Sequence, residues 1–215
     1  MDQQNIPPEL YTMLGGDTYD FIVKSERAVP LGQALSPMLF GFVWLLITGC
    51  LFTAFIGPIF MGNEVHFKSN GVETVAGPQN LEPLLFPISF ISIFFLIGLA
   101  VFGNGLYLLF AKGPWYIGKE KELIVYKKNK IRTISYEQFS GDSEVGGDPQ
   151  KGTITLQLRT GKMVSQKNRA DRYVPDKIYI AGIQNALQVE QVLKKRIKEN
   201  DPTPSTTVDS SGLIA

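Results

Sequence analysis

The chain has 215 residues, enough for one or two domains, and a formal net charge of only +1. This charge is unevenly distributed, because 18 of the 21 Lys and Arg residues lie from Lys112 onward, and 28–63 and 83–111 contain no charged residue. The single cysteine, Cys50, excludes an internal disulfide, and one cysteine with one histidine excludes a Cys/His zinc site within a monomer.

Residues 1–36 precede the first apolar run, and we treat them as a separate N-terminal segment. Within it, residues 19–24 (YDFIVK) have the composition of a short strand. Two interpretations fit this stretch: a strand that adds to another part of the chain, or a segment at a membrane interface. The sequence does not choose between them.

Two long uncharged runs follow, at 38–62 and 84–110. With a rise of about 1.5 Å per residue, the first run extends about 37 Å as a helix, enough for a hydrocarbon core of about 30 Å. Neither run has the amphipathic stripe of a helix buried in a soluble core. We therefore predict a two-helix transmembrane hairpin over 37–111, with an external loop at 63–83.

Basic residues near the ends of these runs predict their orientation. The 63–83 loop carries only Lys68, whereas residues 112–132 carry seven Lys and Arg. Basic loops stay on the cytoplasmic side, so we expect a multi-pass protein of the cell membrane with both termini in the cytoplasm. In the loop, two alternating stretches flank Asn70-Gly71 and predict a β-hairpin.

Small residues indicate how the two helices pack. Gly49, Thr53 and Gly57 recur every four residues, and we place Gly41 on the same face. Such spacing lets helix backbones approach closely in lipid. The preferred interpretation is contact with the second helix of the same hairpin, and the alternative is a seam between two copies of the chain. For Asn104 we expect a hydrogen bond between the helices, because neither run contains an ionisable partner that would form an ion pathway.

From Trp115 onward the residues alternate between apolar and polar, as in half-buried strands. A helix with an apolar stripe follows, for which Asn185 and Gln188 predict a weak capping box, and the tail at 201–215 is expected to be disordered. We expect a tight turn at Gly161-Lys162 and a polar loop over 166–176. The predicted strands are 115–118, 122–127, 130–135, 139–145, 153–160, 163–165 and 177–181.

About seven short strands followed by one helix resembles the order of a pleckstrin-homology (PH) domain. The resemblance is carried by WYIGKEKELIVYKKNKIRTISYEQFSG and IYIAGIQNALQVEQVLKKRI, which look like the opening strands and the terminal strand and helix of bacterial PH-like domains. It implies an α+β membrane protein in which a transmembrane hairpin precedes a PH-like β-barrel or sandwich at 112–200 with a C-terminal capping helix. Such domains are interaction platforms, and the resemblance identifies no ligand.

The sequence offers no catalytic set. It has no nucleophile motif, phosphate-binding loop or metal cluster, and its one histidine, His66, is predicted on the opposite side of the membrane from the main domain. Glu137, Asp142, Glu144 and Asp148 form an acidic stretch that we interpret as solvated. We therefore expect no enzymatic activity, no cofactor and no metal.

Residues 112–200 contain 18 Lys and Arg and 10 Asp and Glu, a net charge of +8. Basic residues near an anionic leaflet contribute about 1 kcal/mol each to binding, so non-specific contact with anionic headgroups is the preferred interpretation. Four of these residues loosely resemble the phosphoinositide pattern of some PH domains: Lys119, Lys121, Lys130 and Arg132. Nucleic acid is not expected, because exposed aromatic residues do not interleave the charge. The candidate contact residues for lipid or a partner are Lys119, Lys121, Lys127, Lys128, Lys130 and Arg132.

Two functional hypotheses follow. The first is a non-enzymatic integral membrane protein whose cytoplasmic domain is a binding or assembly module at the inner leaflet. The second is a homo-oligomeric pore or an accessory subunit of a membrane transport complex, for which the Gly49, Thr53 and Gly57 face is the motivation.

Overall fold

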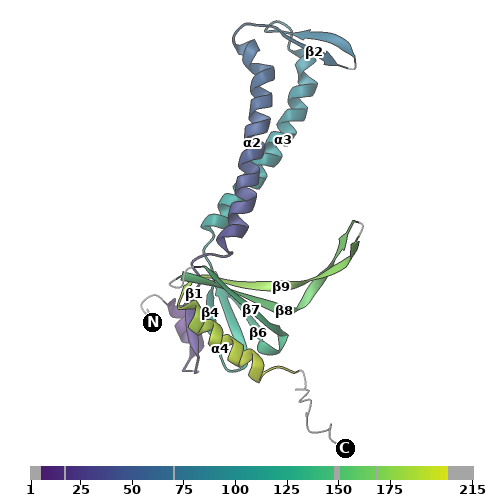
Figure 1. Ribbon diagram of the computed structural model, residues 1–215. Helices are drawn as coiled ribbons and strands as arrows, with labels where there is room; N and C mark the ends of the chain where they lie inside the picture. Colours follow the sequence, from purple (N-terminus) through teal and green to yellow (C-terminus); the bar gives the residue numbers. More distant parts are fainter. Residues whose placement is uncertain (1–5, 17, 70, 148–150, 168, 203–215) are drawn as a thin grey trace, which may run out of the picture. The chain divides into compact units, whose positions relative to one another are not determined.

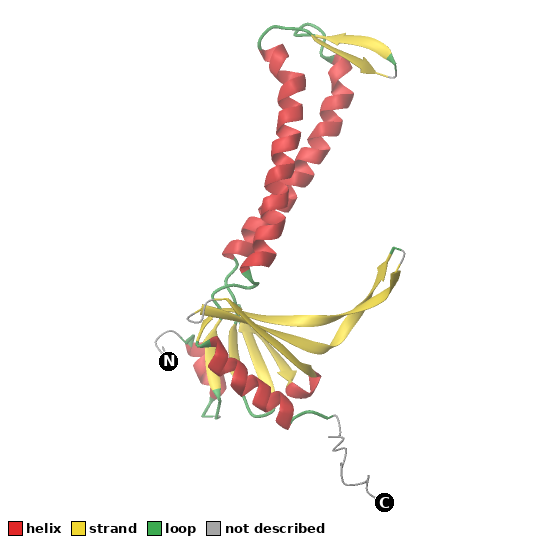
Figure 2. Ribbon diagram, in the orientation of Figure 1, coloured by secondary structure: helices red, strands yellow, loops and turns green. Residues whose placement is uncertain are grey.

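The computed structural model describes residues 6–202 except 17, 70, 148–150 and 168, so nearly all of the predicted tail at 201–215 lies outside the described residues. The chain forms two compact units. Residues 31–111 form the first, here called the helical unit, and residues 1–30 together with 112–215 form the second, here called the β-unit. The fold is α+β, with long apolar helices in one unit and antiparallel sheets in both (Figures 1 and 2).

The helical unit is built from α2 (Leu31–Phe60) and α3 (Leu85–Phe110). Both are long and apolar enough to cross a membrane, with mean hydropathies of 2.3 and 2.6 in their most apolar stretches. α2 begins directly after Pro30, before the predicted position 38. Its first turns contain polar residues such as Gln33 and Ser36, so they were not part of the apolar run from which the helix was predicted.

Glycines set the contact between α2 and α3. Gly41, Gly98 and Gly105 are buried. A Cβ atom at Gly41 would lie 2.6 Å from the backbone nitrogen of Phe102, and one at Gly105 would lie 2.5 Å from that of Met38. The helices therefore touch backbone to backbone at Gly41 and Gly105, which larger residues would prevent.

The connection between the two helices contains β2 (Val65–Ser69), β3 (Val72–Ala76) and a short 3₁₀ helix, η2 (Glu82–Leu84). β2 and β3 pair in antiparallel register from Val65 opposite Ala76 to Ser69 opposite Val72, which leaves a two-residue connection. Gly71 in this connection has a φ of +83°, a conformation that glycine adopts readily. The predicted hairpin is confirmed, although Asn70 itself lies outside the described residues.

Among the described residues of the β-unit, seven strands form two antiparallel sheets, of order β1-β4-β5-β6 and β7-β8-β9. The bounds of four of these strands are Phe21–Lys24 for β1, Phe139–Gly147 for β7, Lys151–Gln166 for β8 and Arg169–Gln184 for β9. Three strands have the predicted bounds: β4 (Trp115–Gly118), β5 (Glu122–Lys127) and β6 (Lys130–Ser135). Lys128 and Asn129 join β5 to β6 with φ values of 48° and 59°, as in the left-handed turns that favour two-residue hairpins. A 3₁₀ turn, η3 (Tyr136–Gln138), leads into β7 (Phe139–Gly147).

The predicted turn at Gly161-Lys162 and the predicted loop over 166–176 are wrong. β8 (Lys151–Gln166) continues through Gly161, and β9 (Arg169–Gln184) already begins at Arg169. The reason is a cross-strand arrangement: the ring of Tyr173 lies 2.7 Å from where a Cβ of Gly161 would be, so this glycine accommodates an aromatic neighbour instead of making a turn.

The main hydrophobic core of the β-unit lies between the two sheets and α4 (Ala186–Glu199). The predicted apolar stripe of α4 is confirmed, because Ala186, Val189, Leu193 and Ile197 are all buried. The predicted capping box is wrong, because the side chain of Asn185 makes no capping hydrogen bond. Such a cap requires an extended backbone at this residue, whereas Asn185 is left-handed with a φ of 54°.

The N-terminal residues belong to the β-unit. β1 (Phe21–Lys24) pairs antiparallel with β4, so of the two interpretations of 19–24 the added strand is correct. α1 (Pro8–Leu14) packs Leu10 and Leu14 against Ile117 and Tyr126, on the face of the four-stranded sheet opposite the main core. Residues 1–36 are therefore not a segment of their own, since Pro30 ends one unit and Leu31 begins the other.

Candidate functional site

Along the chain, the helical unit lies between β1 and β4, which are neighbouring strands of one sheet. Lys24, the last residue of β1, pairs with Trp115, the first residue of β4. The pairing continues beyond the strands, where Ser25 N donates to Pro114 O at 3.0 Å and Gly113 N donates to Glu26 O at 3.4 Å. We call this the junction end of the sheet, because the chain leaves it toward α2 and returns to it from α3.

Ser25 holds the junction end against β9. Its side chain is buried, its Oγ accepts a hydrogen bond from Ala181 N at 2.8 Å, and the carbonyl oxygens of Arg27 and Ala181 lie 2.7 and 2.8 Å away to accept its proton. A Cβ at Gly113 would lie 2.5 Å from Arg27 O, so only glycine fits there. The two chain segments are thus fixed side by side.

Basic side chains collect at the same end. β5 runs back from Glu122 to Lys127, which brings Tyr126 opposite Trp115 and the β5–β6 turn to the junction end. Lys24 is also there, with its Nζ 5.3 Å from the centroid of the Trp115 ring, a cation–π contact. Within the described part of the chain, none of these exposed lysines forms an ion pair. We call the following residues the basic rim: Lys24, Lys112, Lys127, Lys128 and Lys130.

Two of the predicted contact residues lie at the opposite end of the sheet. Lys119 N donates to Glu122 O at 3.0 Å, and Lys121 O accepts from Tyr136 N at 3.0 Å, which places both residues beside the start of β5. Five residues along a strand correspond to about 16 Å, so the predicted single patch is divided between two ends. Arg132, exposed and opposite Val125, lies between them.

The phosphoinositide-like pattern is therefore not assembled. Lys119 and Lys121 come before β5 in the chain, and Lys130 comes after it. The length of β5 therefore separates them, although they are close in sequence. A single headgroup does not reach all four residues of the pattern. What remains together is the basic rim.

The structure corrects the predicted helix packing. Nothing lies within 4 Å of a Cβ built at Gly49, a Cβ at Gly57 meets only Thr53 of its own helix, and Thr53 is exposed. The prediction that the face of Gly49, Thr53 and Gly57 contacts α3 is therefore wrong, whereas Gly41 does contact α3. Eight residues at about 100° each turn the helix by about 80° beyond two full turns, so Gly41 and Gly49 do not share a face.

Asn104 does not form the predicted hydrogen bond between the helices. It is exposed on α3 and makes no side-chain hydrogen bond to any residue that the structure describes. The inter-helix bond is made instead by Trp44, whose Nε1 donates to Phe94 O at 2.9 Å. No sequence pattern predicts this bond, because its acceptor is a backbone carbonyl.

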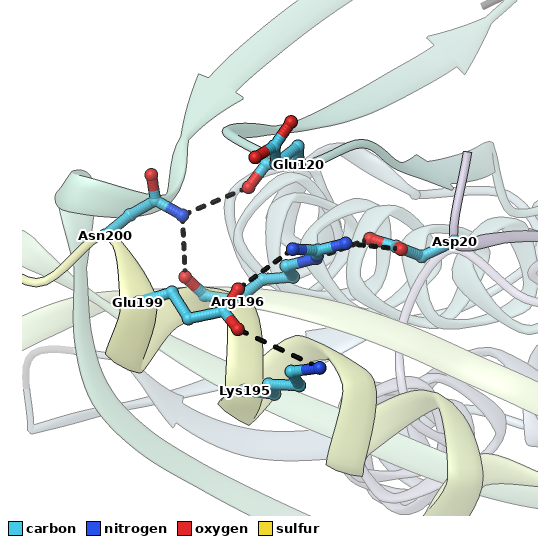
Figure 3. A network of polar contacts seen from close by, with 6 residues as sticks. All are labelled: Asp20, Glu120, Lys195, Arg196, Glu199 and Asn200. Atoms are coloured by element: carbon cyan, nitrogen blue, oxygen red, sulfur yellow. Dashed lines mark hydrogen bonds and ion pairs between the residues drawn. The ribbon is translucent and has the colours of Figure 1, made fainter. Parts of the chain in front are cut away.

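A polar network closes the far end of the β-unit (Figure 3). Arg196 donates from Nε and Nη2 to the two carboxylate oxygens of Asp20, both at 2.7 Å, and from Nη1 to Glu199 at 2.9 Å. Asn200 Nδ2 donates to Glu120 O at 3.0 Å. Arg196 lowers the pKa of Asp20, and its own charge is paired with that carboxylate, so this contact joins the N-terminal residues to α4 and does not offer Arg196 to a ligand.

Glu190 makes a second link, between α4 and β7. Burial raises the pKa of this carboxyl, but hydrogen bonds from Lys194 Nζ at 2.7 Å and Ser143 Oγ at 2.6 Å outweigh burial and lower it overall. The carboxylate is satisfied by these two donors. Its role is to fix the helix on the sheet.

Side chains for chemistry are dispersed. The described residues contain no group of three or more His, Cys, Asp and Glu that could hold a metal ion. Glu137, Asp142 and Glu144 are exposed, and Asp148 lies outside the described residues. His66 is exposed on β2 and lies 4.0 Å from Glu64.

Comparison with known proteins identifies no relative. No family model matches the sequence, and no curated protein or solved structure matches it. The candidate site is therefore argued from its own geometry, and the basic rim is the part of it that remains together.

Proposed function

We propose that the protein is a non-enzymatic integral membrane protein whose β-unit is a PH-like binding and assembly module at the cytoplasmic face of the cell membrane. Exposure of α2 and α3 supports the membrane part. Only 11% of the most apolar 18-residue stretch of each helix is buried, whereas a helix in a soluble core is mostly buried. Lipid is the solvent that matches such a surface.

Seven strands in sheets of four and three, followed by one helix against the core, support the resemblance to PH domains. Here the transmembrane hairpin interrupts that domain after its first strand instead of preceding it. The fold does not specify a ligand, so the function rests on the site. The cytoplasmic orientation rests on the basic residues that follow Ala111 and on the single Lys68 in the external loop.

The basic rim is the observation that carries the proposal. Along the chain, residues 28–30 and 111–112 connect the junction end to the two helices, and three extended residues span about 10 Å. The rim therefore stays close to the leaflet in any orientation of the β-unit. Its five lysines contribute about 1 kcal/mol each against anionic lipid, without requiring a specific headgroup.

A pair of matched probes tests this function. The full chain with Cys50→Ser carries a fluorophore at Lys128→Cys, in the rim, or at Lys121→Cys, at the far end of the same sheet. Both changes remove one lysine, and in nanodiscs with anionic lipid we expect lipid-borne quenchers to quench only the Lys128→Cys probe. Equal quenching at both positions would sink the proposal.

Orientation is tested separately with Asn70→Cys in the same background. A membrane-impermeant thiol reagent should label this position in intact cells. Labelling only after permeabilisation would reverse the topology.

One observation favours a second candidate, a homo-oligomeric pore or an accessory subunit of a transport complex. The face with Gly49, Thr53 and Gly57 is not occupied by α3 and so is open to another helix. Neither helix contains a charged residue, which disfavours ion conduction. Crosslinking through the exposed Cys50 in membranes tests this candidate, and absence of any dimer would remove its support.

A further inference from the structure

The distal part of the β8–β9 hairpin extends beyond its sheet as a two-stranded ribbon (Figures 1 and 2). β7 pairs with β8 only between Gly152 and Leu158, whereas β8 and β9 remain paired past Gly161 opposite Pro175. We call residues 161–167 and 169–175 the distal ribbon. Its base is held by Tyr173 Oη, which donates to Arg159 O at 2.7 Å.

The distal ribbon exposes large apolar side chains. Met163 is 64% exposed and Tyr173, its cross-strand partner, 48%. Val164 and Val174 are 45% and 39% exposed on the other face. A two-stranded ribbon is marginally stable in water by itself, so apolar residues exposed on it indicate a surface that covers them.

The charge of the ribbon indicates what that surface is. Its sequence contains Lys162, Lys167, Arg169 and Arg172 against one acid, Asp171, a net charge of +3. In the ladder Lys162 lies opposite Val174 and Arg172 opposite Val164, so on this face basic and apolar residues alternate. Interleaved basic and apolar residues, with an aromatic residue nearby, suit the interface of an anionic bilayer.

The ribbon is continuous with the junction end. β9 runs from the ribbon to Ala181, whose carbonyl accepts hydrogen bonds from Glu26 N at 3.0 Å and Arg27 N at 3.4 Å. The seven steps along the strand from Val174 to Ala181 span about 23 Å. One end of this strand is therefore fixed where the chain continues into α2, and the other end carries the exposed apolar residues.

We propose that the distal ribbon docks on the surface of an anionic bilayer, with its apolar side chains at the boundary between headgroups and acyl chains and with Lys162 and Arg172 on lipid phosphates. This inference rests on the proposed function, because it requires α2 and α3 to hold the β-unit at a membrane. Pairing with the ribbon of a second copy is disfavoured, because two segments of charge +3 repel each other.

The test uses the full chain with Cys50→Ser and a fluorophore at Met163→Cys, in nanodiscs of phosphatidylcholine with or without phosphatidylglycerol. We expect quenching by lipids with a shallow quencher only when phosphatidylglycerol is present. A fluorophore at Glu144→Cys, which is exposed on β7, is the control and should remain unquenched. Equal quenching of the Met163→Cys probe with and without the anionic lipid, or none in either, overturns the inference.

A charge variant makes the result quantitative. Lys162→Gln with Arg172→Gln removes two charges from the ribbon and should shift the equilibrium between docked and free ribbon about 30-fold toward the free state. Lys195→Gln with Lys198→Gln removes two exposed charges from α4 and should leave the equilibrium unchanged. Equal effects of the two pairs overturn the inference.

A probe at native Cys50, which is exposed on α2, distinguishes failure of the ribbon contact from failure of the proposed function. A fluorophore there should be quenched by lipids with a deep quencher if α2 crosses the bilayer. Quenching at Cys50 without quenching at Met163→Cys rejects the ribbon contact alone, whereas no quenching at either position rejects the proposed function. Proximity between Met163→Cys labels of two copies in phosphatidylcholine alone would identify a second copy, not lipid, as the occupant.

Discussion

At the scale of single residues, two tyrosines of the core differ in one respect. Tyr116 Oη donates to Tyr179 O at 2.9 Å, whereas Tyr136 Oη is buried and has no hydrogen-bond partner among the described residues. Burial raises the pKa of Tyr116 to about 12 and that of Tyr136 further. Both hydroxyls therefore remain protonated at neutral pH, and only one of them contributes a hydrogen bond.

Replacing each tyrosine with phenylalanine should separate them. Tyr116→Phe should lower the free energy of unfolding by about 1 kcal/mol, because the Tyr179 carbonyl loses its donor. Tyr136→Phe should leave it unchanged or raise it by about 1 kcal/mol, because it removes a hydroxyl that is buried without a partner. Thermal unfolding in detergent micelles measures both, and a larger loss for Tyr136→Phe would contradict the assignment.

The ion pair of Asp20 and Arg196 predicts a dependence on pH. The pKa of the Asp20 carboxyl is lowered in the folded chain. The pair therefore stabilises the fold fully above about pH 4, the ordinary pKa of an unfolded Asp. This contribution is lost as the pH falls through the lower pKa of the folded state. Asp20→Asn should cost about 1 kcal/mol at pH 7 and less at pH 3, which lies below the ordinary pKa of an unfolded Asp. A cost that is the same at both pH values, measured by denaturant unfolding, would count against this pair.

At the scale of elements, the packing of α2 on α3 depends on which glycine is replaced. Gly41→Val should weaken the packing by about 1–3 kcal/mol, because a Cβ there meets the Phe102 backbone. Gly49→Val is the matched control and should have little effect within one chain. Thermal unfolding followed by helical circular dichroism tests both. A loss for Gly49→Val that appears only at high protein concentration would instead indicate contact between copies.

The elements that could be predicted are those in which local pattern and tertiary contact agree. β4, β5 and β6 alternate over their whole length and have the predicted bounds. The β8–β9 hairpin was divided wrongly, because Gly161 and Pro175 normally interrupt strands and here lie opposite each other. The predicted contact residues are close together in sequence. A strand separates the residues before it from those after it, so Lys121 and Lys128 lie at opposite ends of β5.

At the scale of the whole molecule, the division into units does not follow the order of the chain. β1 lies before the helices and pairs with β4 after them, so the β-unit is discontinuous in sequence. A search for domains along the sequence treats residues 1–36 as separate, because nothing local in YDFIVK names its partner strand. The partner is identified by the edge of β4 and by the Arg196 side chain that meets Asp20.

The pairing of β1 with β4 has a consequence for biosynthesis. β1 leaves the ribosome about ninety residues before its partner strand, so the four-stranded sheet cannot be completed until the whole hairpin has been translated. If α2 and α3 cross the bilayer as proposed, the two strands meet only when the hairpin returns to the side it started from. A chain inserted with one helix left outside the bilayer would keep β1 and β4 apart, and its four-stranded sheet would remain incomplete.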